Sequence, residues 1–160
     1  MRLPENDFQI LRLTDAFYRE YPNPPYVEIL KKMKRAYNCI LFQTNYDYYI
    51  CVPYRTEISH TYSYCFKNSA RSREHKSGVD YTKSVIINNG DYIDNKDALI
   101  DQDEYKETMI NLKRINREAL LFVEDYVLHM KGVKFLHAKE FARRYQYSPL
   151  KYFHKELGIA

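Results

Sequence analysis

Short runs that alternate between apolar and polar positions dominate the first half of the chain, a pattern typical of β-strands. The first run covers residues 8–13. Thr14 or Asp15 can then cap a short helix that ends by Tyr21, because prolines follow at positions 22, 24 and 25. Residues 26–35 have partly helical spacing, but the prolines before them and the strand-like residues after them favour a loop. We expect a strand, a short helix and a loop in this order.

The clearest hairpin joins residues 37–42 to residues 48–53 through a short turn that contains Asn and Asp. A second pair of strands is expected at 62–66 and 81–88. The loop between them, residues 67–78, is rich in serine and basic residues and contains no apolar anchor. We expect this loop to be mobile until an anionic partner orders it.

From residue 101 the apolar positions recur every three or four residues, which predicts one long amphipathic helix that ends at Lys131 and Gly132. Its apolar stripe comprises Tyr105, Met109, Leu112, Ile115, Ala119, Phe122, Tyr126 and Met130. Carboxylates at its start favour the positive end of the helix dipole, and metal ligation is the alternative role for them. These carboxylates belong to Asp101, Asp103 and Glu104.

Two short helices are expected at the C-terminal end, over residues 137–145 and 148–157, the second with Ser148 as N-cap and Pro149 at its first position. With 160 residues and 45% hydrophobic composition, the chain is long enough for one sizeable core, and we expect a single α+β domain over residues 1–160. No apolar run approaches the roughly 20 residues of a membrane-spanning helix. The first residues lack the apolar segment of a signal peptide, so we expect a cytoplasmic protein without a membrane partner.

The three cysteines, Cys39, Cys51 and Cys65, are odd in number, lack C-x-x-C spacing and lie in strand-like surroundings, so we expect buried thiols and no zinc site. The net charge of +4 is unevenly distributed, as expected if one face meets a polyanion. Basic residues gather at 31–35, at 67–76 and after 131, whereas acidic residues gather at 91–107. The 17 tyrosines can stack on unpaired bases or fill the faces of strands.

Motifs of nucleotide cofactors and serine hydrolases are absent, and only four glycines are present to form a phosphate-binding loop. The residues around the predicted strand ends suit metal-free RNA cleavage, in which the 2′-hydroxyl attacks the neighbouring phosphate. His60 can move a proton near neutral pH. Arg55 and Lys83 offer positive charge, and hydroxyl donors come from Thr56, Ser59 and Ser84. The alternatives are a histidine with a structural role at a strand edge and a serine that forms a turn. No cofactor or metal is expected.

Two segments carry a family resemblance: residues 58–66, Ile-Ser-His-Thr-Tyr-Ser-Tyr-Cys-Phe, and residues 77–87, Ser-Gly-Val-Asp-Tyr-Thr-Lys-Ser-Val-Ile-Ile. They resemble the toxins of type III toxin-antitoxin systems, nearest to the CptN and TenpN branches of the ToxN and AbiQ superfamily. The resemblance implies a MazF-like, partly open, strongly bent antiparallel β-barrel with a long amphipathic helix and small C-terminal helices. It also implies a sequence-selective endoribonuclease that leaves 2′,3′-cyclic phosphate and is inhibited by a small repeat RNA pseudoknot, which it processes.

Toxins of this family carry a Thr-Ser-x-Lys element at a strand exit, and the corresponding region here, residues 54–60, keeps the hydroxyls but lacks the lysine. Arg55 or His60 can replace it, and Lys34 or Arg35 matches a basic residue before the first hairpin strand. The partners implied are the antitoxin RNA, mRNA substrates and an RNA-bridged protein–RNA oligomer. The expected RNA contacts are Lys31, Lys34, Arg35, Lys67, Arg71, Arg73, Lys76, Tyr81, Ser84, Arg143 and Arg144.

Two other functions fit the same sequence. Residues 137–155 resemble a helix-turn-helix in length, with Lys151 and His154 expected to face outwards, although Pro149 would open the recognition helix. An RNA-binding protein without catalysis is the third possibility, and only RNA cleavage separates it from the first.

Overall fold

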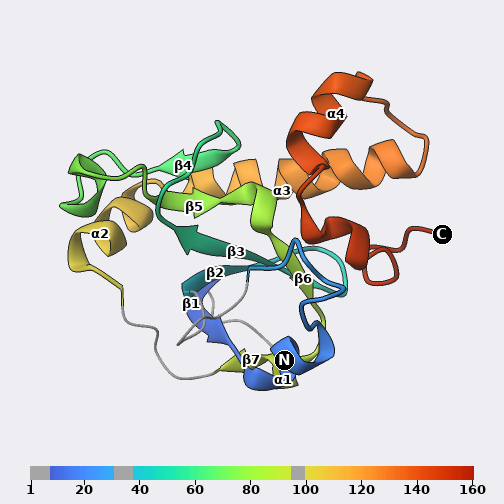
Figure 1. Ribbon diagram of the computed structural model, residues 1–160, viewed down its shortest axis with the longest axis horizontal. Helices are drawn as coiled ribbons and strands as arrows, with labels where there is room; N and C mark the ends of the chain where they lie inside the picture. The colour runs from blue at the N-terminus through green and yellow to red at the C-terminus, as the bar shows by residue number, and fades with distance from the viewer. Residues whose placement is uncertain (1–7, 31–37, 95–99) are drawn as a thin grey trace.

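The computed structural model describes residues 8–30, 38–94 and 100–160, and within these ranges the chain has an α+β fold (Figure 1). All strand pairs are antiparallel, in the order β4-β5-β3-β2-β1-β7 with β6 also paired to β3, and the sheet does not close. The strands are β1 (Phe8–Leu13), β2 (Asn38–Gln43), β3 (Tyr49–Arg55), β4 (Ser63–Cys65), β5 (Gly78–Asp80), β6 (Val85–Ile87) and β7 (Ile93–Asp94).

The predicted hairpin is confirmed by the pairing of β2 with β3, which runs from Cys39 opposite Pro53 to Gln43 opposite Tyr49. Strand β1 pairs with the other edge of β2. Most of their apolar side chains are buried, Ile40 and Ile50 among them, whereas Ile10, Tyr49 and Tyr54 are partly buried. Cys39 and Cys51 are buried thiols as predicted, whereas Cys65 is only half buried.

The predicted pairing of residues 62–66 with 81–88 is wrong. Strand β4 pairs with β5, and β6 pairs with the first half of β3. Since Tyr54 faces Val79 and Cys51 faces Val85, residues 80–84 stand opposite only two residues of β3. The surplus residues form the 3₁₀ helix η2 (Tyr81–Lys83), which the Asp80 side chain caps by accepting from the Thr82 amide.

The helices are α1 (Asp15–Glu20), α2 (Gln102–Ile110), α3 (Leu112–Met130) and α4 (Ala138–Tyr145), with 3₁₀ turns η1 (Arg71–Arg73), η3 (Gly90–Tyr92) and η4 (Pro149–Tyr152). The single long helix predicted from residue 101 is therefore two helices that break at Asn111. Helix α2 buries Glu104, Glu107 and Thr108, and it leaves Tyr105 and Met109 exposed. Its inward face is thus polar, the reverse of the predicted stripe.

The second C-terminal helix is also shorter than predicted, because η4 ends at Tyr152. Ser148 caps it and Pro149 opens it, as expected. Its side chains serve packing: Leu150 is fully buried, Lys151 pairs with Glu28, and His154 Nε2 lies 2.6 Å from the Tyr126 hydroxyl. A four-residue 3₁₀ turn lacks the length of a DNA-recognition helix.

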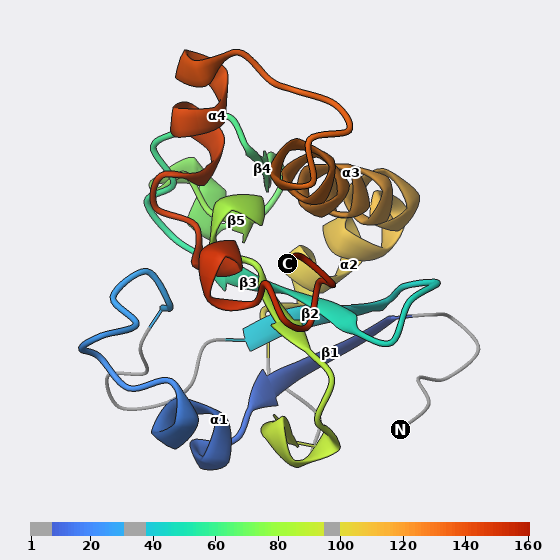
Figure 2. The ribbon, with the colours of Figure 1, turned by 90° about the vertical axis from the view of Figure 1, so that its right-hand side faces the viewer.

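Helices α3 and α4 lie on one side of strands β2 and β3, and α1 lies on the other, as the two perpendicular views show (Figures 1 and 2). Ile115, Ala119 and Phe122 of α3 join the buried side chains of the sheet in one core. None of the helices in the described ranges has the length and apolar character needed to cross a membrane.

Candidate functional site

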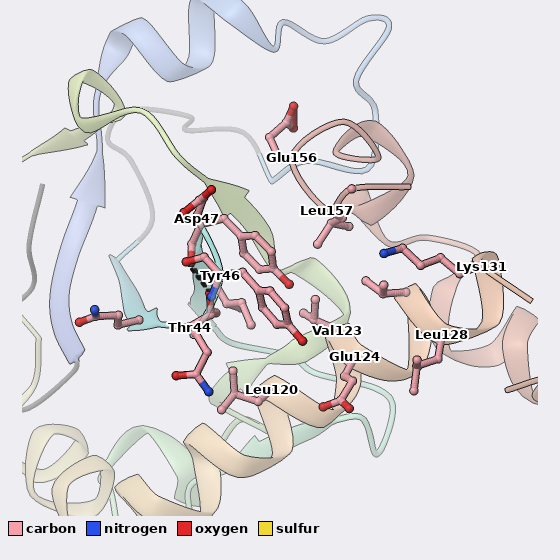
Figure 3. Close-up of a pocket in the computed structure, with 16 residues that line it drawn as sticks. Thr44, Tyr46, Asp47, Leu120, Val123, Glu124, Leu128, Lys131, Glu156 and Leu157 are labelled. Atoms are coloured by element: carbon pink, nitrogen blue, oxygen red, sulfur yellow. Dashed lines mark hydrogen bonds between the residues drawn. The ribbon is translucent and has the colours of Figure 1, made fainter. Parts of the chain in front are cut away.

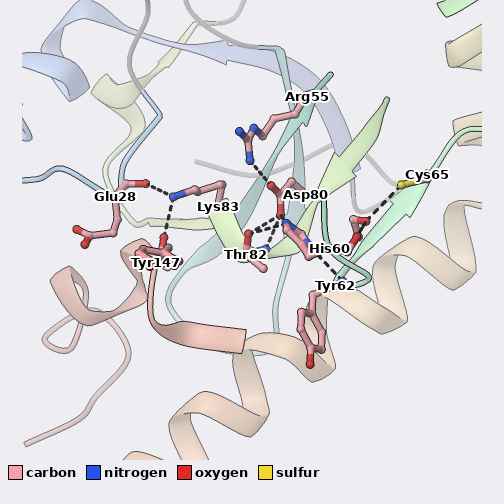
Figure 4. A network of polar contacts seen from close by, with 10 residues as sticks. Glu28, Arg55, His60, Tyr62, Cys65, Asp80, Thr82, Lys83 and Tyr147 are labelled. Carbon is pink, nitrogen blue, oxygen red and sulfur yellow. Dashed lines mark hydrogen bonds and ion pairs between the residues drawn. The ribbon is translucent and has the colours of Figure 1, made fainter. Parts of the chain in front are cut away.

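A buried carboxylate organises the predicted site residues. Asp80 is completely buried, at the end of β5, and one of its oxygens accepts a hydrogen bond from Arg55 Nη1 at 2.6 Å. The other oxygen accepts from the amide and hydroxyl of Thr82, at 2.9 and 2.6 Å, and lies 3.1 Å from His60 Nε2 (Figure 4). Asp80 therefore joins the β3 exit, the 59–62 turn and η2.

Both ring nitrogens of His60 have partners. Nδ1 accepts from the backbone amide of Tyr62 at 3.1 Å, and since an amide can only donate, Nδ1 carries no proton in this arrangement. The proton is on Nε2, where it is shared between Asp80 and the Thr82 hydroxyl at 3.3 Å. The imidazole also stacks on the Tyr62 ring, with centroids 6.2 Å apart. The position of His60 after β3 follows from the sequence, whereas its tautomer is set by the contact with Asp80.

Lys83 does not join this cluster. Its ammonium donates to the backbone carbonyls of Tyr147, at 2.8 Å, and Glu28, at 3.2 Å (Figure 4). Burial, and then the charge of Arg55, lower the pKa of Lys83 from its ordinary value. The contacts tie η2 to two other segments, which gives Lys83 a structural role in this arrangement.

Thr56 and Ser59 are exposed on the turn between β3 and β4, and neither contacts Asp80. Ser84, a predicted RNA contact, is completely buried. The Ser84 hydroxyl is itself buried and has no hydrogen-bond partner among the described residues.

An open groove of about 570 Å³ begins at His60. Its cationic side chains are Lys67, Arg73, Lys76 and Arg114, against a single carboxylate, Glu74. The excess of positive charge suits phosphate groups. Three of the predicted RNA contacts thus lie in one groove with the predicted catalytic histidine.

The basic loop is held by acidic side chains of α2, whereas the sequence predicted a loop without an apolar anchor that stays mobile until an anionic partner orders it. The Glu107 carboxylate is buried and accepts from the amides of Lys67 and Asn68 and from the Tyr64 hydroxyl. Asp103 accepts from the Ala70 amide at 2.7 Å. The anionic group that orders the loop is supplied by the protein itself.

The remaining predicted contacts are scattered. Arg71 pairs with Asp101 at 2.9 Å, and Arg143 lies 3.6 Å from Glu140; neither lines the groove. Tyr81 is buried, and its hydroxyl donates to Glu118. Arg144 pairs with Asp125 and Glu140 next to the groove. Lys31, Lys34 and Arg35 lie outside the described residues.

A larger cavity, of about 690 Å³, lies between the 43–48 turn, α3 and the C-terminal residues (Figure 3). Its charged lining is mainly acidic, with Asp47, Glu124 and Glu156 against Lys131. It contains none of the predicted site residues, and its charge disfavours phosphate.

Sequence reasoning missed Asp80, Thr82 and Arg114. Asp80 stands two residues before Thr82, the spacing at which an aspartate caps a turn, and this signal was hidden because residues 81–88 were predicted to form one strand. Nothing in the sequence indicates that Arg114 faces the groove. No three metal-ligating side chains gather within residues 8–30, 38–94 and 100–160.

No family model, curated protein or solved structure matches this chain. The resemblance to type III toxins therefore stays a prediction that rests on the sequence, and the site must be interpreted from its own geometry.

Proposed function

We propose that this protein is an endoribonuclease that needs no metal, and that it is the toxin of a type III toxin-antitoxin system with a MazF-like barrel as its finer fold. The observation that supports the proposal is the position of His60, whose tautomer is set by the buried Asp80, at the end of a groove with four cationic side chains. A histidine oriented by a carboxylate beside a phosphate-binding surface is the set of groups that RNA transesterification requires.

In this reaction the 2′-oxygen of one ribose bonds to the neighbouring phosphorus, and its proton passes to a base. The bond from phosphorus to the 5′-oxygen of the next nucleotide breaks, and that oxygen takes up a proton from water. The products are a 2′,3′-cyclic phosphate and a 5′-hydroxyl. The groove cations assigned to phosphate binding are Lys67, Arg73 and Lys76.

His60 can transfer a proton only after one of its nitrogens leaves its present partner. The bond from Nε2 to Asp80 is charge-assisted, and such bonds are about twice as strong as the neutral bond that Nδ1 accepts from the Tyr62 amide. Nδ1 is therefore the nitrogen that substrate binding frees, and it becomes the base. Arg55 supports this arrangement from the other oxygen of Asp80.

The test is incubation of the purified protein with single-stranded RNA in excess EDTA, followed by analysis of the product ends. We expect cleavage with cyclic phosphate ends, and we expect a single 2′-deoxy substitution at the cleaved nucleotide to abolish it. His60→Ala should lower the rate at least about 100-fold, the usual contribution of a general base. His137→Ala, at an exposed histidine that lines neither the groove nor the Asp80 cluster, is the control.

Cleavage that needs added magnesium, or that survives the 2′-deoxy substitution, would contradict the mechanism. A His60→Ala variant within tenfold of the parent would reduce His60 to a structural role. Coexpression with the repeat RNA encoded beside the gene, followed by mass measurement, tests the antitoxin partner and the RNA-bridged oligomer.

A further inference from the structure

A smaller cavity of about 350 Å³, here called the second cavity, adjoins the groove and is lined by Tyr62. The two spaces share Thr61, Ser63 and Arg114 in their linings. Tyr62 links them: its amide donates to His60, and its ring lies 5.8 Å from the guanidinium of Arg144 in the second cavity. A chain that occupies the groove beside His60 therefore reaches the second cavity with its next group.

The charges of the two spaces differ in a way that separates two kinds of ligand. The groove has four cations against one carboxylate, whereas the second cavity has two of each, Arg114 and Arg144 against Glu118 and Asp125. An excess of cations suits a phosphate. A balanced set of donors and acceptors suits a neutral group with both kinds of polar edge, such as a nucleobase.

The walls of the second cavity suit a flat ring. Tyr62 is half exposed on one side, and the buried rings of Tyr81 and Phe122, with centroids 6.5 Å apart, form the apolar floor. Tyr62 is held at both ends, because its hydroxyl donates to Glu140 at 3.0 Å. Unpaired bases stack on aromatic and guanidinium groups held in this way.

The polar groups retain capacity for a ligand. Arg114 uses Nε for Glu118 at 3.2 Å, and its guanidinium lies over the Tyr64 ring at 5.2 Å; its two terminal nitrogens have no hydrogen-bond partner among the described residues. Each carboxylate oxygen of Glu118 accepts one bond, from Tyr81 or from Arg114, and has a second lone pair. Two adjacent acceptors and a guanidinium therefore face the same space.

We propose that this cavity binds one unpaired guanine of the RNA substrate, next to the phosphate at His60. Guanine presents two adjacent donors, N1–H and the N2 amino group, which match a carboxylate. It also presents two adjacent acceptors, O6 and N7, which match a guanidinium. The proposal rests on the proposed function for its RNA substrate, and it names the base that the enzyme selects.

The test measures binding to uncleavable RNA, so that it does not depend on catalysis. Fluorescent hexanucleotides with 2′-deoxy substitutions, UUGUUU and its A, C and U counterparts at the third position, are titrated with the protein and followed by anisotropy. We expect the guanine oligomer to bind roughly tenfold more tightly than the others, within the range of one bidentate base contact. A lack of RNA cleavage in the separate assay would contradict the proposed function and leave this measurement intact.

Two variants locate the effect. Glu118→Gln removes the acceptor charge, and Leu121→Trp fills the cavity from a side chain that is 50% exposed, so the fold tolerates it. Both should abolish the guanine preference and leave the affinity for the uridine oligomer within about twofold. Glu124→Gln, on the same helix but outside this cavity, is the control and should keep the preference.

Equal affinity for the four oligomers, or a preference for another base, would overturn the assignment. A guanine preference that survives both variants would place the base elsewhere. Free guanosine monophosphate should compete only weakly, because it lacks the neighbouring phosphates that reach the groove. Competition at concentrations near those of the oligomer would assign the cavity to a free nucleotide instead of RNA.

Discussion

Arg55, His60 and Asp80 show how far single residues could be predicted. Arg55 and His60 are five positions apart at the exit of one strand, so the sequence alone indicates that they are neighbours. Asp80 is the carboxylate that joins them, and it becomes their neighbour only because β5 pairs with the last residues of β3. A contact between distant strands depends on register, and the register here shifts at η2, which the strand-like residues 81–88 conceal.

Asp80→Asn tests whether this carboxylate supports the site. The amide keeps one acceptor oxygen, but its NH₂ group faces a donor, Arg55 or Thr82, and the charge opposite Arg55 is lost. We expect unfolding free energy to fall by about 2 to 4 kcal/mol, as when one partner of a buried charged pair is removed. Urea denaturation measures the loss, and Asp47→Asn, an exposed aspartate, should change stability by less than about 0.5 kcal/mol. An effect no larger than the control would mean that the cluster contributes little to stability.

Substitution of Glu104, unlike that of Asp80, is expected to raise the stability of the protein, by an amount that depends on pH. It is buried, one of its oxygens has no hydrogen-bond partner among the described residues, and burial raises the pKa of its carboxyl. Because the folded-state pKa exceeds the unfolded value, the folded state loses stability as pH rises through the window between the two. We expect Glu104→Gln to stabilise the protein by about 1 kcal/mol at about pH 7.5, and the gain to vanish below about pH 4, where both states are protonated.

Thermal melts across this pH range measure the effect, with Glu20→Gln on the exposed surface of α1 as the control. A gain that is the same at acidic and neutral pH would show that the charge of Glu104 is not the cause.

At the scale of elements, hydrophobic periodicity correctly predicted the strands and the helix whose positions depend only on packing against the apolar core. Helix α3 has one apolar face against the core, and β2 and β3 are each buried along four consecutive residues, so the positions of these elements follow from the apolar pattern. Helix α2 does not, because its inward face contacts backbone amides of the 67–70 loop and needs carboxylates there. A rule that places apolar residues inside assigns such a helix to the wrong phase. The same contact explains why the basic loop has partners that its own sequence does not indicate.

Glu107→Gln tests the attachment of this loop to α2. The substituted NH₂ group meets the amides of Lys67 and Asn68, so at least one charge-assisted hydrogen bond is lost. Such bonds are worth about 1.5 to 3 kcal/mol, so hydrogen exchange at these amides should accelerate roughly 10- to 100-fold. Exchange in β2 should stay unchanged. Uniform acceleration across the protein would indicate global destabilisation, and unchanged exchange would show that the loop is held by other contacts.

At the scale of the whole molecule, the net charge of +4 says less than its placement. The larger cavity is lined mainly by carboxylates, whereas the smaller groove at His60 collects lysine and arginine. Size alone would select the wrong cavity for a polyanion, because the energy of a phosphate depends on the local charge. The sequence indicated clusters of charge, but which clusters share a groove depends on how β4, the loop and α3 are packed.

The salt dependence of RNA binding tests this distribution. The groove variant carries three substitutions of groove cations: Lys67→Ala, Arg73→Ala and Lys76→Ala. The control variant removes three exposed cations that line neither the groove nor the cavity beside Tyr62: Arg19→Ala, Lys139→Ala and Lys155→Ala. The two variants therefore have the same net charge. For single strands each neutralised phosphate contributes about 0.7 to the slope of log affinity against log salt, so the groove variant should reduce the slope by about 2. The control variant should reduce it by much less, because its cations lie away from the bound strand. Equal reductions in the two variants would mean that RNA responds to the total charge of the protein, and the groove would then lose its assignment as the binding surface.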